Sequence, residues 1–237
     1  MEFKNYGAFM IKNIFLDLDD TLLDFHKGER EAITKTLSHF GVEVTDELIA
    51  RYRSFNRSCW EALERGEMKR DDVLTKRFEL FFDSVGRDVS ATEVQAYYEV
   101  RLSEGCYFID GAEQLLSELS GKYNLYITSN GTAFVQDRRI KASGIAEYFD
   151  GIFISERMGA HKPSVDFFNA CFSNMKNPVR EQTVIIGDSL TSDILGGINA
   201  GIHTCHYTLG RDFEYTDIKP EYSVKYLSEI PGILEKI

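Results

Sequence analysis

Short, almost wholly apolar runs recur along the chain, separated by longer segments whose apolar positions have helical spacing. Because these runs lack polar alternation, they are typical of strands buried on both faces of a parallel sheet. The alternation of strand and helix predicts right-handed βαβ units, and therefore an α/β fold with a doubly wound, Rossmann-like parallel sheet. The predicted strands cover residues 13–18, 124–129, 151–155, 183–188 and 203–208.

The segments between these strands predict amphipathic helices. In residues 111–123, Leu115, Leu116 and Leu119 fall on one helical face, and Gly121 indicates where the helix ends. Residues 191–202 are rich in small side chains, so we expect that helix to pack closely against the sheet. The remaining predicted helices cover residues 133–145 and 164–175.

Residues 25–106 break this rhythm, because they contain no convincing strand and four helical patterns. We expect them to form a helical cap domain resembling a four-helix bundle. The rest, residues 1–24 and 107–237, would form the α/β core domain, with residues 1–9 as an additional arm. The four helical patterns stop at Gly41, Gly66, Gly86 and Gly105.

Composition and charge narrow the possible partners. The chain is 43% hydrophobic and 13% aromatic, which is typical of a globular protein, and its net charge of −11 makes a nucleic acid polymer a poor partner. The four cysteines form no Cys-x-x-Cys pair, no apolar run could cross a membrane, and the first residues do not resemble a secretory signal. We expect a cytoplasmic protein, monomeric or weakly dimeric, with a small-molecule substrate.

Three aspartates, Asp17, Asp19 and Asp20, directly follow the first apolar run. The side chains of Asp17 and Asp19 can point the same way because the two residues are i and i+2 on an extended segment. Two unpaired carboxylates about 4 Å apart would repel by roughly 4 kcal/mol at an effective dielectric constant near 20. A divalent cation, or a proton on one carboxylate, removes that repulsion. The alternative interpretation is that both only cap a turn.

A second acidic pair, Asp188 and Asp193, follows the predicted strand at 183–188. Gly187 allows the backbone to approach closely there. Two strand ends with converging carboxylates form a hard, oxygen-rich site, which favours Mg²⁺ over zinc or copper. Asp193 taken alone could be an ordinary acid in the first turn of a helix.

Two further segments could bind an anion. Ser129, Asn130 and Gly131 end a predicted strand and precede a helix whose N–H groups point outward, although the same residues are also an ordinary helix start. Lys162 lies on a loop before Pro163, where a fixed lysine can neutralise several negative charges. Most lysines are solvated, and that is the alternative here.

These motifs occur in a fixed order: Asp17 to Thr21, then Ser129 to Gly131, then Lys162–Pro163, then Gly187–Asp188 with Asp193. From Met10 onward, the chain therefore resembles the haloacid dehalogenase-like hydrolase superfamily, and its helical insert resembles the C1 cap of that superfamily. The cap segments "FNRSCWEALERGEM" and "KRFELFF" are similar to the pyrimidine nucleotidase subfamily, as is the core segment "IGDSLTSDILGGINAGI".

The resemblance implies a role for each core residue. Asp17 would be the nucleophile that attacks phosphorus, and Asp19 would act as general acid and then general base. Ser129 and Lys162 would hold the transferring phosphoryl group. Thr21 would help to fix Asp19. The resemblance assigns Thr21, Asn130 and Gly131 to the substrate-binding part of the site.

The resemblance also implies how the metal is bound. Mg²⁺ would be held by the Asp17 carboxylate, by the backbone carbonyl of Asp19 and by Asp188. Asp193 would orient the metal's waters or Lys162. The predicted function is a Mg²⁺-dependent phosphatase of small phosphate monoesters that works through an aspartyl-phosphate.

Substrate identity should depend on the cap, for which Asn56, Trp60 and Arg77 are the candidates. Asn56 and Trp60 are i, i+4 neighbours, and an aromatic ring beside an amide donor would suit a nucleobase. With the subfamily resemblance, this favours a pyrimidine nucleoside 5′-monophosphate. The alternative is that Trp60 only packs the helical bundle.

Other activities are known for this fold. A 2-haloacid dehalogenase would not need Asp19, and a non-catalytic binding protein would be expected to have lost Asp17, Asp19, Lys162 or Asp188, all of which are present. The sequence does not exclude a sugar-phosphate or phosphoglycolate phosphatase, or a phosphomutase.

Overall fold

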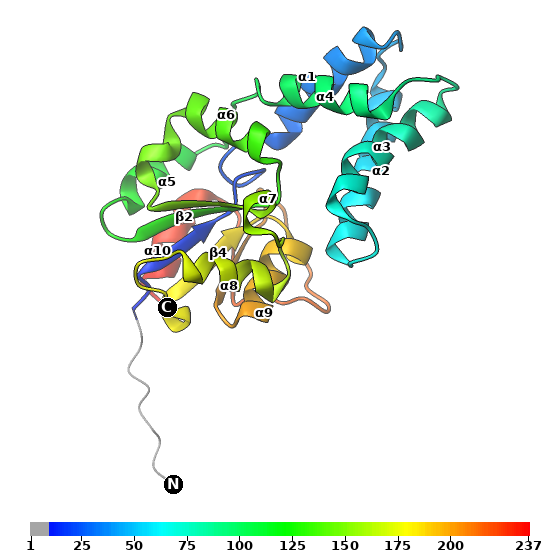
Figure 1. Cartoon of the computed structure of the whole chain (residues 1–237). Helices are drawn as coiled ribbons and strands as arrows, with labels where there is room; N and C mark the ends of the chain where they lie inside the picture. The colour runs from blue at the N-terminus through cyan, green and yellow to red at the C-terminus, as the bar shows by residue number, and fades with distance from the viewer. Residues whose placement is uncertain (1–9) are drawn as a thin grey trace, which may run out of the picture. The chain divides into compact units, whose positions relative to one another are not determined.

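The computed structural model describes residues 10–237, drawn in Figure 1, so the predicted arm at residues 1–9 lies outside the described residues. The chain divides into two compact units. Among the described residues, an α/β unit consists of 10–24, Phe108–Ala133 and Ser143–Ile237, and a helical unit consists of Phe25–Tyr107 and Phe134–Ala142. The sequence did not predict that residues 134–142 would group with the helical unit. That the helical unit works as a cap stays a prediction.

The α/β unit is built on six parallel strands in the order β3-β2-β1-β4-β5-β6, which confirms the doubly wound sheet. The five predicted strands are confirmed within two residues at each end. The sixth was missed because its three residues are too few to form an apolar run. The strands are β1 (Asn13–Leu16), β2 (Asn124–Ser129), β3 (Gly151–Ile154), β4 (Thr183–Gly187), β5 (His203–Tyr207) and β6 (Tyr222–Val224).

The strand order indicates where on the sheet a ligand would bind. Strand β1 pairs with β2 on one side and with β4 on the other, so that Asn13 is in register with both Asn124 and Thr183. From β1 the chain adds β2 and β3 on one side, and it then adds β4, β5 and β6 on the other. Ligands of such sheets bind beyond the carboxyl ends of the strands at this reversal point. The residues that follow β1 and β4 are therefore the first candidates.

Both faces of β1 are buried, which explains why its sequence shows no polar alternation. Phe15 packs with Phe168 and Phe172 of helix α8 (Val165–Ser173), and its ring centroid lies 5.5 Å from that of Phe172. Its neighbours Ile14 and Leu16, also fully buried, point to the opposite face. Each such burial contributes roughly 1.5–3 kcal/mol.

The predicted close packing of the small-residue helix is confirmed. Helix α9 (Leu195–Ala200) follows a helical turn at Leu190–Ile194. A Cβ atom on Gly197 would lie 2.6 Å from side-chain carbons of Ile185 and Thr204, so only glycine allows the helix to approach the sheet this closely.

The other helices of the α/β unit are short. Helix α5 (Ala112–Leu119) buries Leu115, Leu116 and Leu119, as its pattern predicted. Figure 1 shows α8 and α9 on one face of the sheet and α5 on the other. The remaining helices and helical turns are α7 (Ser155–Met158), α10 (Ile230–Leu234), Ile145–Tyr148, Arg180–Gln182 and Leu227–Glu229.

The helical unit confirms the four predicted helices. Thr45 caps the second of them by accepting a hydrogen bond from the Leu48 N–H at 3.2 Å. The core of the helical unit is rich in aromatic rings, and Tyr52 stacks on Phe78 with ring centroids 5.5 Å apart. The helices are α1 (Phe25–His39), α2 (Asp46–Glu64), α3 (Arg70–Ser84) and α4 (Ala91–Leu102), with α6 (Ala133–Ser143) added from later in the chain.

Every helix within residues 10–237 is too short or too polar to span a bilayer. All four cysteines are free thiols, and only Cys106 is not buried. Burial raises the pKa of Cys171 and of Cys205 to about 12, so these thiols are poor nucleophiles.

Candidate active site

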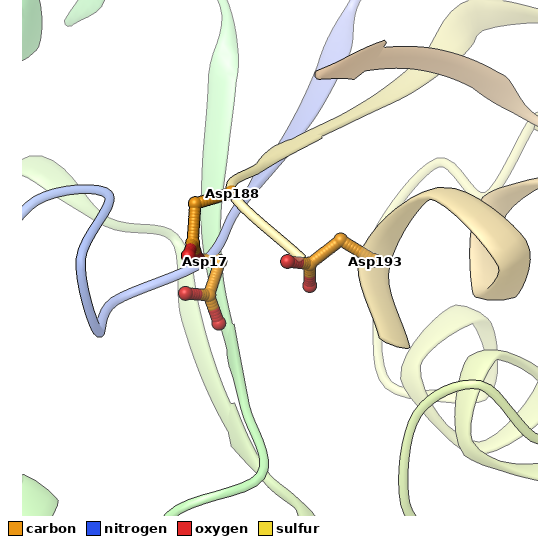
Figure 2. Close-up of side chains that lie close together, drawn as sticks. All are labelled: Asp17, Asp188 and Asp193. Atoms are coloured by element: carbon orange, nitrogen blue, oxygen red, sulfur yellow. The ribbon is translucent and has the colours of Figure 1, made fainter. Parts of the chain in front are cut away.

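Three carboxylates converge beyond the carboxyl ends of β1 and β4, as Figure 2 shows. Asp17 directly follows β1, and its N–H donates to the carbonyl of Ile186 at 3.0 Å. Asp188 directly follows β4, and Asp193 lies in the helical turn after it. One carboxylate oxygen from each of Asp17, Asp188 and Asp193 lies within 4.8 Å of the other two. The structure therefore brings together three of the four predicted metal-site residues through their side chains.

The loop after β4 folds back onto the end of the strand, and Gly187 makes this possible. A Cβ atom on Gly187 would lie 2.3 Å from Oδ2 of Asp193, closer than any side chain could approach. That same oxygen accepts a hydrogen bond from the Ser189 N–H at 3.1 Å. The hydroxyl of Ser189 in turn accepts from the Ser192 N–H at 3.2 Å. These local bonds fix the direction of the Asp193 carboxylate.

Lys162 supplies the cation of the site. Its side chain is 1% exposed, and its ammonium donates to Oδ1 of Asp17 at 2.6 Å, to Oδ1 of Asp193 at 2.6 Å and to the Thr128 carbonyl at 2.8 Å. Burial disfavours the ammonium, but attraction to the two carboxylates outweighs it and raises the pKa of Lys162 above its usual range. Lys162 is therefore charged throughout the physiological range, and it is buried and paired where the alternative interpretation expected a solvated side chain.

The carboxylates outnumber the ammonium. Burial raises the pKa of Asp17 to about 8 although Lys162 lowers it, and repulsion from Asp193 and Asp19 contributes to the rise. Desolvation, followed by repulsion from Asp17, also raises the pKa of Asp188 well above its usual value. If ionised, three carboxylates and one ammonium carry two excess negative charges, which one divalent cation would balance. The donor set therefore fits a hard divalent cation held by oxygen ligands.

The three carboxylates are not equally able to bind a cation directly. Both oxygens of Asp193 are engaged, one by Lys162 and the other by the Ser189 N–H. This arrangement suits the predicted role in which Asp193 orients Lys162. It leaves Asp17 and Asp188 as the side chains most open to the cation.

The turn after β1 places Asp19, Asp20 and Thr21. Asp20 has a positive φ of 57°, and its N–H donates to the Leu23 carbonyl at 2.8 Å, so the chain reverses immediately after Asp19. The Asp19 carboxylate lies outside the three-carboxylate cluster but close enough to raise the pKa of Asp17. The Thr21 hydroxyl is buried and has no hydrogen-bond partner among the described residues. The predicted roles of Asp19 and Thr21 stay predictions.

The end of β2 is tied to the lysine loop by one amide. Asn130 accepts a hydrogen bond from the Lys162 N–H at 2.9 Å and donates to the Lys162 carbonyl at 2.9 Å. Ser129 is buried beside it, and its hydroxyl accepts from the Gly131 N–H at 3.1 Å. Asn130, predicted to bind substrate, thus holds the backbone that carries Lys162.

The N-terminus of α6, predicted to bind an anion, is partly occupied by a carboxylate of the protein itself. The Ala133 N–H donates to Oε2 of Glu156 at 2.6 Å, so a carboxylate already satisfies this helix N-terminus. Sequence reasoning missed Glu156 because an acid in the short helix α7, after the next strand, carries no local signal of that contact.

The predicted cap residues Asn56, Trp60 and Arg77 form one network within the helical unit. Oδ1 of Asn56 accepts from Trp60 Nε1 at 3.1 Å and from Arg77 Nη1 at 2.7 Å. Its Nδ2 donates to Glu29 at 3.0 Å, and Arg77 also donates to Gln95 at 2.7 Å. The buried polar atoms of Asn56 and Arg77 are thus used to join the helices, while Trp60 keeps some exposure. Substrate binding by these three residues stays a prediction.

Glu29 and Gln95 complete this network, and sequence reasoning missed both. Glu29 is 2% exposed and lies in the buried stripe of α1 with Ala32 and Ile33. An acid within an apolar helical face was the signal that could have revealed it. Gln95 carries no comparable signal, because a glutamine is tolerated on either face of a helix.

Known proteins resemble this chain over most of its length. The model of the haloacid dehalogenase-like hydrolase family matches residues 11–201. YfnB of Bacillus subtilis, named for the same hydrolase family, is 35% identical over 223 residues, covering 94% of this chain and 95% of its own. The pyrimidine 5′-nucleotidase PynA of Streptococcus pneumoniae is 32% identical over 226 residues, covering 95% of both chains. The pyrimidine 5′-nucleotidase YjjG of Escherichia coli is 29% identical over 223 residues, covering 94% of this chain and 97% of its own.

The fold agrees as well. The crystal structure of Bacillus subtilis YfnB bound to magnesium superposes with a TM-score of 0.90, at 35% identity, and covers 95% of this chain and 99% of that one. Family, order of motifs and geometry all point the same way, and the chain belongs to the haloacid dehalogenase-like hydrolase family.

Proposed function

We propose that this hydrolase is a Mg²⁺-dependent 5′-nucleotidase that prefers pyrimidine nucleoside monophosphates. Its class, a hydrolase of phosphoric monoesters, follows from the family match and from the two nucleotidase relatives. The chemistry is carried by one observation: Lys162 binds both Asp17 and Asp193 where these carboxylates meet Asp188. The preference for pyrimidine nucleotides is supported by PynA and YjjG, whose similarity extends over nearly the whole chain.

The chain's own residues can carry out phosphoryl transfer in two steps. Asp17 attacks phosphorus, forming an aspartyl-phosphate as the bond to the nucleoside oxygen breaks, and Asp19 gives that oxygen a proton. Asp19 then takes a proton from the water that attacks phosphorus, which releases phosphate and restores Asp17. Lys162 and Ser129 bind the phosphoryl oxygens, where negative charge accumulates.

Lys162 has a second task, because Asp17 must be ionised to attack. The pKa of Asp17, about 8 in the cation-free site, leaves most of the population protonated at neutral pH. The Lys162 ammonium favours the ionised form. All three ammonium hydrogens already have acceptors, so a bound phosphoryl oxygen must replace one of them.

The Asp17 and Asp188 carboxylates would hold the cation, together with the Asp19 carbonyl, while Asp193 orients Lys162. A bound divalent cation supplies the positive charge that lets a carboxylate approach a phosphate dianion. Magnesium is supported by the all-oxygen donor set and by the magnesium bound to YfnB.

We assign substrate selection to residues 25–106, acting as a cap. This assignment is supported by a helical unit that has its own aromatic core, and by the interdomain movement described for YfnB. Movement of such a unit would exclude water during transfer and permit release of the product.

The test is a comparison of kcat/KM, with Mg²⁺ in excess, for UMP, CMP, dTMP, AMP, phosphoglycolate and glucose 6-phosphate. We expect the pyrimidine nucleotides to be the best substrates, no turnover in excess EDTA, and none by Asp17→Asn. A clear preference for phosphoglycolate or a hexose phosphate would reject the nucleotidase while leaving the phosphatase. Undiminished turnover in EDTA would reject the metal site.

A further inference from the structure

A buried histidine on the neighbouring strand contacts the backbone of Asp188. His206 is 1% exposed and lies on β5 in register with Gly187, the last residue of β4. Its Nε2 atom lies 2.9 Å from the carbonyl oxygen of Asp188, and its Nδ1 atom lies 2.8 Å from the Tyr215 hydroxyl. The histidine thus connects the residue that leaves β4 to a segment that follows β5.

These two contacts define the tautomer. A carbonyl oxygen can only accept, so Nε2 of His206 carries the hydrogen and donates it to Asp188. In the neutral ring, Nδ1 then accepts from the Tyr215 hydroxyl. The Tyr215 hydroxyl, which can donate, thus suits the tautomer that the Asp188 carbonyl requires.

Aromatic packing holds the imidazole in this position. The ring of Phe213 meets it edge-on, with centroids 4.9 Å apart and an interplanar angle of 88°, and the ring of Tyr215 lies 5.6 Å away. Phe213 and Tyr215 in turn stack on each other with centroids 5.4 Å apart. A ring packed in this way cannot swing away from the Asp188 carbonyl without displacing both aromatic side chains.

Asp188 needs such a support because it is the first residue beyond the sheet. The ladder of β4 ends at Gly187, and the loop then turns toward Asp193. The orientation of the Asp188 peptide sets the direction of its Cα–Cβ bond, and hence where its carboxylate points. One buried donor on the carbonyl therefore controls the position of a carboxylate in the three-carboxylate cluster.

We propose that His206 is a positioning residue for the metal site, and that its Nε2–H holds the Asp188 peptide so that the Asp188 carboxylate faces the cation. This inference rests on the proposed function, which makes Asp188 a cation ligand. No motif in the sequence marks His206. Groups that orient metal ligands typically contribute 10–100-fold to metal affinity.

The experiment measures Mg²⁺ binding to the metal-free protein by isothermal calorimetry, with the Mg²⁺-dependent rise in Tm as a second readout. His206→Phe removes the donor but keeps an aromatic ring against Phe213. His206→Gln restores an N–H donor near the position of Nε2. His203→Phe is the matched control, because His203 lies on the same strand, points to the opposite face and contacts Glu221 instead.

We expect His206→Phe to bind Mg²⁺ at least about tenfold more weakly, and His206→Gln and His203→Phe to bind within about threefold of wild type. In His206→Phe, the Mg²⁺ concentration needed for half-maximal turnover should rise more than kcat falls. Tyr215→Phe should produce a smaller shift in the same direction, and it provides the test if His206→Phe does not fold.

Three results would overturn the proposal. One is wild-type Mg²⁺ affinity in His206→Phe, or in Tyr215→Phe if that variant must replace it. Another is equal weakening in His206→Gln and His206→Phe, because packing and not the donor would then be responsible. Failure of the wild-type protein to bind Mg²⁺ would overturn the metal site and this proposal with it, and that failure would be visible without any variant.

Discussion

The ammonium of Lys162 lies 2.6 Å from a carboxylate oxygen of Asp17, although the two residues are 145 positions apart in the chain. Both are almost fully buried, so each side chain depends on the other for compensation of its charge. Breaking a buried ion pair by removing one partner is strongly destabilising, because an uncompensated charge remains. Here the loss also affects chemistry, since Asp17 must remain ionised to attack phosphorus.

The first prediction concerns Lys162→Met. Without the ammonium, the pKa of Asp17 should rise further above 8 and the phosphoryl group should lose a cationic contact, so kcat should fall about 10²–10³-fold. Steady-state kinetics at saturating Mg²⁺ would measure this. Lys176→Met, at an exposed position of the same unit, should leave kcat unchanged. A kcat within a few-fold of wild type in Lys162→Met would contradict the role of the lysine.

The second prediction concerns pH and stability without a cation. The pKa of Asp17 in the folded protein, about 8, lies above the ordinary 3.8, so between these values the folded state binds more protons than the unfolded state. Stability then falls as pH rises. The raised pKa of Asp188 acts in the same direction. In EDTA, Tm should therefore fall from pH 5 to pH 8, apart from effects of other groups.

Asp17→Asn separates that contribution from the rest, because an amide does not titrate. Its Tm in EDTA should depend less on pH than that of wild type, and the stabilisation of wild type by Mg²⁺ should grow from pH 5 to pH 8. Differential scanning calorimetry at several pH values gives both quantities. Identical pH profiles for wild type and Asp17→Asn would show that Asp17 does not titrate in this range.

The third prediction tests the close approach of Asp193 to the backbone. In Gly187→Ala, the new methyl group would lie 2.3 Å from Oδ2 of Asp193, so the carboxylate must move away from Lys162 and from the Ser189 N–H. We expect a loss of about 1–3 kcal/mol in the free energy of unfolding, with a large fall in kcat. Gly232→Ala is the control, because no atom lies within 4 Å of its added methyl group. Wild-type activity in Gly187→Ala would refute the constraint.

The fourth prediction concerns the buried network of the helical unit. Asn56→Leu removes one acceptor of Arg77 and one donor to Glu29, so that a buried guanidinium and a buried carboxylate each lose a hydrogen bond, although Glu29 keeps its ion pair with Arg53. We expect the free energy of unfolding to fall by about 1–3 kcal/mol or more. Urea denaturation would measure this, with Ser58→Ala, at an exposed position of the same helix, as the control. Equal stability of the two variants would mean that the network contributes little.

Sequence alone predicts the elements that depend on local pattern. The five longer strands could be located because most of their residues are buried and few are charged, as Phe15 and its neighbours show. The motif aspartates could be placed together because the strand ends of a parallel sheet share one edge. In contrast, β6 could not be predicted, because its three residues, Tyr222 to Val224, are held by pairing with β5 and not by a pattern of their own.

Side-chain partners are harder to predict than elements. The sequence placed Asn56 and Arg77 on helices correctly, but only the fold shows that Glu29 and Gln95 occupy their polar groups. The hydrogen bond from His206 to Asp188 is likewise unpredictable, because it depends on the register of β4 with β5. Long-range contacts of this kind leave no trace in local spacing.

The last prediction concerns Trp60 and the choice of substrate. Its indole N–H is taken by Asn56, and the Arg70 guanidinium lies 5.8 Å from the ring centroid, but the ring keeps some exposure. Base–aromatic stacking contributes about 1–3 kcal/mol in single-strand binding proteins, or roughly tenfold or more in kcat/KM if it persists in the transition state. Trp60→Ala should therefore reduce kcat/KM for UMP about tenfold while leaving that for p-nitrophenyl phosphate nearly unchanged. Trp60→Phe, which keeps an aromatic face, should recover much of the loss. Equal losses on both substrates, accompanied by a lower Tm, would mean that Trp60 only packs against Cys59, Leu63 and Val73 within the helical unit.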